Sequence, residues 1–99
     1  MTSFVVTYPV SDGTSFDADY YTATHIPLVR EKWSQYGLTS ATALIPVDPA
    51  AAYAAIAILE FADGAALDRA MTSPEAAEVF GDVAKFTTIA PVAVRCEAR

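Results

Sequence analysis

Apolar residues recur at every second position in four stretches of the chain, and turn residues end or separate these stretches. In residues 3–10, Phe4, Val6 and Tyr8 fall on one face of a strand. The other three stretches are residues 38–47, 53–61 and 86–96. Residues 53–61 are apolar on both faces, which is typical of a strand that is covered on both sides. The pattern predicts four β-strands.

A helical period replaces this alternation in residues 17–36. Asp17 has the position of an N-cap, and Gly37 supplies the C-terminal stop. Pro27 lies inside this segment, where it removes a backbone donor and clashes with the preceding turn. We therefore expect one helix with a kink or a short break at residues 25–26.

The second helical region has two parts. Asp63 caps a short helix over residues 64–72, and Ser73-Pro74-Glu75 has the composition of a new helix start. The predicted order is therefore β-α-β-β-α-β in a single domain over residues 1–99. Two helices on one face of a four-stranded antiparallel sheet form the ferredoxin-like arrangement of the α+β class.

The second face of such a sheet has no helix to cover it. The chain has 99 residues, of which 54% are hydrophobic, so polar groups are scarce for a small monomer. Together with the apolar central strand, this predicts a homodimer in which two sheets pack face to face.

Charge and targeting signals exclude several partners. The net charge is −6, and the six basic residues form no cluster, which argues against nucleic acid and against an anionic membrane surface. No apolar run reaches membrane-spanning length, and no secretory signal is visible, so we expect a cytoplasmic location. Cys96 is the only cysteine, which leaves no intramolecular disulfide.

Candidate chemistry concentrates in the first predicted helix. His25 is the only histidine, and its ordinary pKa of about 6.5 suits proton transfer near neutrality. Tyr21 lies one turn earlier on the same side and can orient His25 or share its proton. The alternative is that His25 caps backbone freed by Pro27 or hydrogen-bonds in the core, and that Tyr21 is a core ring. Both interpretations remain open.

The walls of a pocket can be supplied by Tyr8, Leu28 and Trp33, although plain core packing explains the same residues. Asp82 is expected to be a helix-end or turn residue rather than an acid partner, and Tyr20 a structural residue. A metal site is not expected, because one histidine and no suitably spaced carboxylate leave too few ligands. No glycine-rich phosphate loop is present, so we expect no nucleotide or flavin cofactor; a haem held only by His25 stays open.

Three motifs resemble the EthD family of the dimeric α+β barrel superfamily. They are Tyr8-Pro9, then Phe16-Asp17-x-x-Tyr20-Tyr21-x-x-x-His25-x-Pro27-Leu28, then Asp82-x-x-x-Phe86-Thr87-x-Ile89-x-Pro91. The resemblance implies a ferredoxin-like protomer that dimerises through its sheet, with a cleft between sheet and helices. Members of the family are often labelled oxidoreductases. Relatives with the same barrel include cofactor-free monooxygenases, lactone isomerases and polyketide cyclases.

Two functional hypotheses follow. The first is a small cofactor-independent enzyme, oxidoreductase-like or an isomerase or cyclase, that acts on a hydrophobic or aromatic carbonyl compound. In it His25 is the acid–base and Tyr21 its helper. The second is a non-catalytic module that binds a hydrophobic metabolite or only dimerises. Whether His25 faces a cavity or is satisfied by backbone distinguishes the two.

Overall fold

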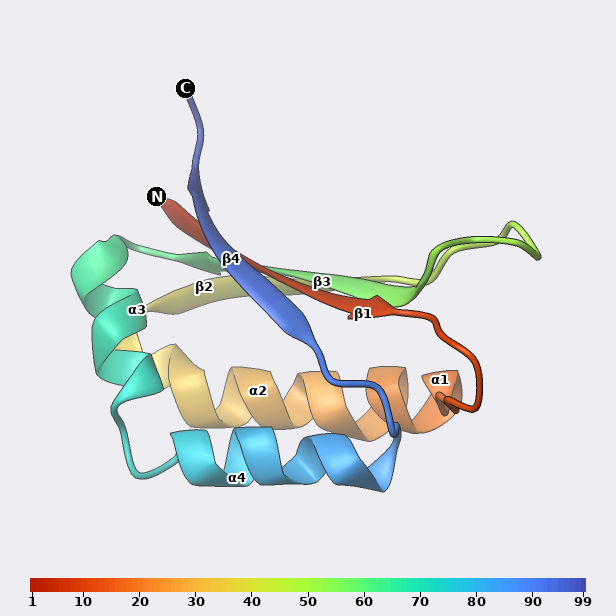
Figure 1. Ribbon diagram of the computed structural model, residues 1–99. Coiled ribbons are helices and arrows are strands. Elements are labelled where there is room, and N and C mark those ends of the chain that lie inside the picture. The colour runs from red at the N-terminus through yellow and green to blue at the C-terminus, as the bar shows by residue number, and fades with distance from the viewer.

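A four-stranded antiparallel sheet forms one layer of the protein in the computed structural model, which describes residues 1–99 (Figure 1). Its strands are β1 (Thr2–Pro9), β2 (Leu38–Leu44), β3 (Tyr53–Phe61) and β4 (Val92–Glu97). The strand order is β2-β3-β1-β4, so the first and last strands are neighbours. This order confirms the predicted ferredoxin-like α+β fold.

The first helical region is a continuous coil under the sheet, built from segments of different pitch (Figure 1). These are α1 (Ala18–Tyr20), a π-turn (Tyr21–His25), α2 (Ile26–Trp33) and a final 3₁₀ turn (Ser34–Tyr36). Asp17 caps the start by accepting a hydrogen bond from the Tyr20 amide at 3.1 Å, as predicted. Gly37 ends the region with φ of 101°, in the left-handed range that glycine favours.

The irregularity expected near Pro27 takes the form of the π-turn rather than a break. The amide of Ile26 donates to the carbonyl of Tyr21, five residues earlier. Pro27 then lies in the first turn of α2, where a missing amide hydrogen is tolerated. The π-turn inserts one extra residue, so the faces of α2 are rotated relative to a regular helix that continues from α1.

The second helical region comprises α3 (Gly64–Met71), α4 (Ala76–Gly81) and a 3₁₀ turn (Asp82–Lys85). Asp63 caps α3 by accepting a hydrogen bond from the Ala66 amide at 2.8 Å. Figure 1 shows α4 running beside α2 under the sheet, while α3 lies at one end of the sheet. The neighbouring placement of α2 and α4 brings residues far apart in the sequence together.

Two strands are shorter than their apolar patterns predicted. β4 begins at Val92 rather than at residue 86, because Pro91 has no amide hydrogen to donate to a ladder. The preceding segment instead pairs with the loop before α1, where the Asp17 amide donates to the Phe86 carbonyl at 2.7 Å. β2 ends at Leu44, shortly before Pro46. The Phe86 ring is buried as a result of this local pairing.

The two faces of the sheet differ in what covers them. The inner face, which carries Phe4 and Tyr8 from β1, packs on the helices and is buried. On the other face, Val5 lies opposite Ile58 of β3 and Val94 of β4, and all helices are on the far side (Figure 1). We call this the outer face; its large apolar residues are Val5, Leu44, Ile56, Ile58, Val92 and Val94.

Candidate functional site

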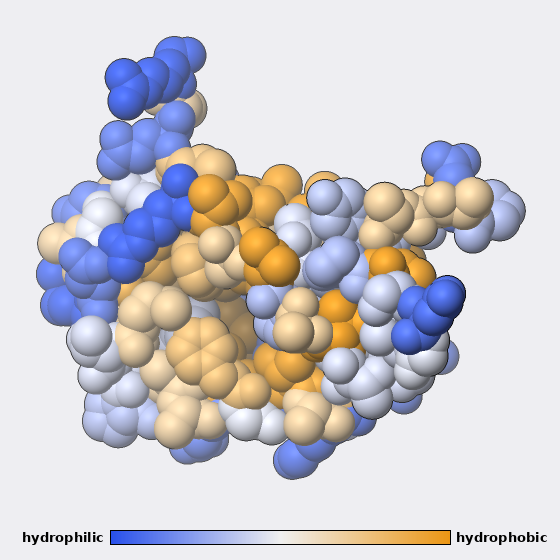
Figure 2. All heavy atoms as spheres, viewed as in Figure 1, coloured by the Kyte–Doolittle hydropathy of each residue, from blue (hydrophilic) through white to orange (hydrophobic).

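A pocket of about 190 Å³ lies between the inner face of the sheet and the helices. Of its 16 lining residues, 14 are hydrophobic, so the pocket is suited to an apolar ligand. Figure 2 shows a recess between β4 and α4, surrounded largely by hydrophobic residues. Phe80 lines the pocket and is 47% exposed, so its ring lies at the opening.

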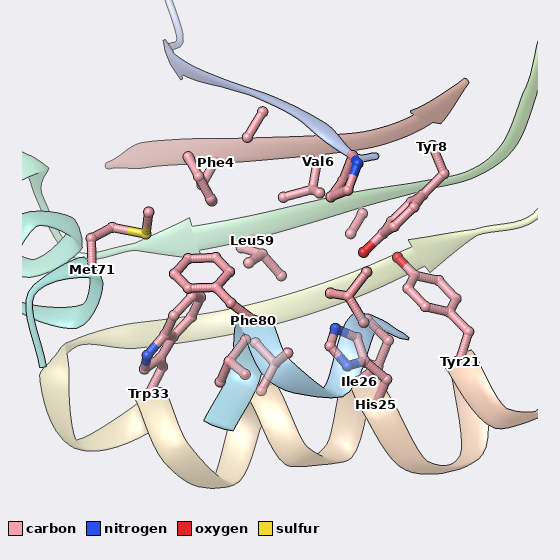
Figure 3. A pocket seen from close by; sticks show the side chains of 16 residues that line it. Phe4, Val6, Tyr8, Tyr21, His25, Ile26, Trp33, Leu59, Met71 and Phe80 are labelled. Carbon is pink, nitrogen blue, oxygen red and sulfur yellow. The ribbon is translucent and has the colours of Figure 1, made fainter. Parts of the chain in front are cut away.

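The structure places four of the five predicted site residues around this pocket. His25, Tyr21, Tyr8 and Trp33 all line it (Figure 3). Leu28 does not: it is half-buried and outside the lining. Its place is taken by the buried side chains of Ile26 and Val29. The extra residue in the π-turn explains the difference, because it rotates the helix face beyond His25 away from the face that regular spacing predicts.

His25 is held by a carboxylate from the second helical region. Its Nδ1 lies 2.9 Å from Oδ2 of Asp82, and both side chains are buried. The other oxygen of Asp82 accepts a hydrogen bond from the Tyr20 hydroxyl at 2.8 Å. Lys85 lies 3.7 Å from the same oxygen, with an exposed side chain. Asp82 thus fixes the histidine ring, and Tyr20 fixes Asp82.

These contacts determine the charge on each group. Burial alone raises the pKa of Asp82, but hydrogen bonds from His25 and Tyr20 and the nearby charge of Lys85 outweigh it, so the net pKa lies below its usual value. Burial lowers the pKa of His25, and the hydrogen bond and charge of Asp82 only partly offset this. At neutral pH the pair is therefore an ionised carboxylate beside a neutral imidazole.

An ionised carboxylate can only accept a hydrogen bond, so the proton of the neutral imidazole lies on Nδ1. The other nitrogen, Nε2, then carries the lone pair, and His25 lines the pocket. A histidine arranged in this way can accept a proton from a molecule that enters the pocket. No backbone group accepts from or donates to the His25 side chain, so His25 does not cap backbone freed by Pro27; its hydrogen bond within the core is the one with Asp82.

Asp82 was expected to be a helix-end or turn residue rather than an acid partner, and its contact with His25 is the feature of the site that sequence reasoning missed. It does begin the 3₁₀ turn after α4, but its side chain reaches across to the first helix, 57 residues away in sequence. The usable signal was the Asp82-x-x-x-Phe86 spacing, since the Phe86 ring lies 4.6 Å from the His25 ring. Both residues of this motif contact the histidine.

Tyr21 relates to His25 differently from the expected helper role. The two rings stack with centroids 5.8 Å apart, and the Tyr21 hydroxyl has no hydrogen-bond partner although it is fully buried. The indole nitrogen of Trp33 is the other buried side-chain atom without a partner. Burial raises the pKa of Tyr8 to about 12 and also raises the pKa of Tyr21, so both hydroxyls stay protonated.

No group of three or more histidine, cysteine, aspartate or glutamate side chains is arranged to hold a metal ion. The single cysteine, Cys96, is exposed at the end of β4. No helix combines the length and apolar character needed to cross a bilayer.

Comparison with known families identifies the chain. The family model described as the EthD domain matches residues 14–90, which is most of the sequence. This chain belongs to the EthD family. Both His25 and Asp82 lie within the matched residues, whereas Tyr8 precedes them. A search of curated proteins gave no match.

Solved structures share the fold of this chain. An EthD-like protein from Ralstonia eutropha JMP134 is 29% identical, with a TM-score of 0.82 over 97% of this chain and 89% of that chain. An ethyl tert-butyl ether D (EthD) family protein from Bacillus halodurans C-125 is 20% identical, with a TM-score of 0.78 over 100% and 99% of the two chains. A dimeric ferredoxin-like protein of unknown function from Jannaschia sp. CCS1 is 21% identical, with a TM-score of 0.70 over 98% of each chain.

Proposed function

We propose that this EthD-family protein is a proton-transfer enzyme that acts on a hydrophobic or aromatic carbonyl compound, with His25 as the base. The observation that carries the proposal is the buried His25–Asp82 pair at 2.9 Å, whose histidine lines a pocket that is otherwise almost wholly apolar. Purely structural histidines rarely combine a buried carboxylate partner with a second nitrogen that makes no hydrogen bond.

The chemistry follows from the positions of the protons. Nε2 of His25 takes a proton from the carbon next to the carbonyl. The electron pair of the broken C–H bond forms a carbon–carbon double bond, and the π pair of the C=O bond moves onto the carbonyl oxygen to give an enolate. The resulting imidazolium is stabilised by the ionised Asp82 on the opposite nitrogen. If the proton returns to a different atom, the reaction is an isomerisation. If the enolate carbon instead attacks a second carbonyl group, the reaction is a cyclisation.

An oxidoreductase outcome shares the first step. The same carbanion can react with dioxygen, which accepts the electron pair and forms a peroxide anion on carbon. The His25 imidazolium then returns its proton to that anion. The base is therefore required for each of the three reaction types, and the acid–base step can be tested without knowing which of them occurs.

The test is exchange of the acidic C–H protons of 2-tetralone, a two-ring ketone, for deuterium in D₂O, followed by NMR. We expect His25→Gln to slow enzyme-dependent exchange by about 10²–10⁴-fold, the usual contribution of a general base. Circular dichroism checks that the variant folds. Exchange by His25→Gln at the native rate would show that His25 is not the base.

A second candidate function is the binding of a hydrophobic metabolite without turnover. It is favoured by the lining, in which 14 of 16 residues are hydrophobic and only His25 titrates near neutrality. It predicts tight binding of apolar molecules to the native protein and to His25→Gln alike, with no catalysed exchange in either.

We also propose that two copies pair through the outer face. This face carries Val92 and Val94, which are 59% and 54% exposed in the single chain, so an apolar sheet surface meets solvent. The solved Jannaschia relative is described as dimeric and has the same fold. If two such faces packed against each other, the valines would be covered and both faces of each sheet would be buried.

A further inference from the structure

Two tyrosine hydroxyls lie at the same end of the pocket as His25. Figure 3 shows the side chains of Tyr8, from β1, and Tyr21, from the π-turn, directed into the pocket with their oxygens toward one another. The ring centroids are 5.5 Å apart in an edge-to-face arrangement. The Tyr21 hydroxyl is fully buried and has no partner in the protein.

A buried hydroxyl without a partner lowers stability, so such a group in a native fold calls for an explanation. Here Tyr21 is 0% exposed, its ring contacts Phe16 and Phe86, and no neighbouring carbonyl or carboxylate accepts from its hydroxyl. A ligand oxygen in the pocket would satisfy it. Because burial keeps both tyrosines protonated, they are donors, and what they fit is an acceptor.

We propose that the hydroxyls of Tyr8 and Tyr21 bind the carbonyl oxygen of the substrate and stabilise the negative charge that forms on it. This inference rests on the proposed proton transfer by His25 and extends it. His25 takes the proton from the neighbouring carbon, and the electron pair that arrives on the oxygen meets two donors in a water-poor site. In this proposal His25 is the base, and the hydroxyls of Tyr8 and Tyr21 are the two hydrogen-bond donors.

The same arrangement defines the substrate class. No lysine or arginine lines the pocket, so a carboxylate or phosphate group would be buried without a counter-ion. The substrate that fits is therefore an uncharged carbonyl compound, of which a ketone such as 2-tetralone is a suitable probe. Its apolar body lies toward the opposite end of the pocket, where Phe4, Trp33, Met71 and Phe80 form the walls (Figure 3).

The size of the cavity limits the class of substrate further. The pocket of about 190 Å³ is slightly larger than an apolar protein cavity of about 150 Å³ that accommodates benzene. A body of one or two fused rings fits, and a longer tail would leave through the opening at Phe80. Trp33 also has a buried nitrogen without a partner, but Figure 3 places it at the end far from His25, so it is not positioned to share the reacting oxygen.

The experiment compares 2-naphthol, the aromatic counterpart of the 2-tetralone enol, with naphthalene, which lacks the oxygen. Equilibrium dialysis gives the dissociation constant of each for the native protein and for Tyr8→Phe, Tyr21→Phe, His25→Gln and Tyr36→Phe. Tyr36 is the matched control, because its hydroxyl bonds Glu75 and does not line the pocket.

We expect the native protein to bind 2-naphthol roughly tenfold more tightly than naphthalene. Each pocket Tyr→Phe variant should reduce this preference several-fold without weakening naphthalene binding, and each should slow 2-tetralone exchange. Tyr36→Phe and His25→Gln should keep the preference. The proposal is overturned if both pocket variants keep the full preference, if only His25→Gln loses it, or if the native protein binds neither compound.

These outcomes separate the two proposals. Retained exchange in His25→Gln would remove the catalytic base but leave the oxygen-binding result intact. Retained naphthol preference in both tyrosine variants, with exchange abolished in His25→Gln, would leave the base in place and remove the tyrosine pair.

Discussion

Asp82 accepts a hydrogen bond from Nδ1 of His25 at 2.9 Å, and both side chains are buried. This contact joins the π-turn of the first helical region to the 3₁₀ turn of the second. It determines which nitrogen of the only histidine is left free. The proposed function of the protein depends on this pair.

Replacement of Asp82 by Asn should weaken the base. The charge of Asp82 and its hydrogen bond raise the pKa of His25, so their loss lowers that pKa further and removes stabilisation of the imidazolium. We expect exchange of 2-tetralone at pH 7 to fall by about 10- to 100-fold. The acidic limb of the pH–rate profile should move to lower pH.

Asp68→Asn is the matched control, because Asp68 pairs with Arg95 at the surface. It should leave both the rate and the profile unchanged. An Asp82→Asn variant with native rate and native profile would remove Asp82 from the mechanism.

Stability should decline below pH 6.5 because of His25. Burial keeps the folded-state pKa of His25 below its value of 6.5 in the unfolded chain, so the unfolded state binds the proton first as pH falls. The contribution is complete above pH 6.5 and is lost as pH decreases toward the folded-state value, by at most about 1.4 kcal/mol per pH unit. Asp82, whose pKa is lowered from 3.8, adds a loss only below that pH.

Urea unfolding at pH 7 and pH 5 measures this effect. The native protein should lose more stability between the two pH values than His25→Gln, which lacks the titrating ring. Equal losses in the two proteins would show that the folded-state pKa of His25 is not lowered.

Removal of the Tyr21 hydroxyl should not destabilise the fold. An unsatisfied buried hydroxyl costs about 1–3 kcal/mol, so Tyr21→Phe should leave the free energy of unfolding unchanged or raise it. Tyr36→Phe loses a hydrogen bond of 2.9 Å to Glu75 and should lower the free energy of unfolding slightly. A Tyr21→Phe variant that is less stable than Tyr36→Phe would mean that Tyr21 has a partner in solution.

A charge on the outer face should separate the proposed dimer. Val94→Asp places a carboxylate at the centre of the apolar strand pair formed with Val5, where pairing of two sheets would bury it. Light scattering after gel filtration should give a dimer for the native protein and a monomer for this variant. Val47→Asp is the control, because Val47 is 93% exposed in the loop between β2 and β3. A native monomer would contradict the proposed pairing.

The alternation of apolar residues was sufficient to predict the fold. Together with the helical period that replaces it in the helical regions, it gave the order of strands and helices, because a strand and a helix bury their apolar residues at different spacings. The caps at Asp17 and Asp63 were readable for the same reason, since side-chain acceptors satisfy free amides at helix starts. The lengths of β2 and β4 were overestimated, because a proline interrupts the apolar run in each.

The site was predictable only in part. Tyr8, His25, Tyr21 and Trp33 were found by residue type, with strand alternation for Tyr8 and helical spacing for the others. Leu28 was misplaced because a π-turn has no local sequence signature that fixes the register. The contact of Asp82 with His25 was not expected, because it depends on how the two helical regions pack and not on the spacing of residues along the sequence. Tertiary contacts of this kind appear only when the two helical regions lie side by side.

The most direct test of the account uses the fact that the chain has one histidine. A sample labelled with ¹⁵N in histidine gives a single imidazole in two-dimensional NMR, and its two nitrogen shifts report the tautomer and the charge. The account predicts a neutral ring at pH 7 with the proton on Nδ1 and a bare Nε2, and a pKa below 6.5. A ring protonated on Nε2, or one that is charged at pH 7, would contradict the assignment of His25 as the base.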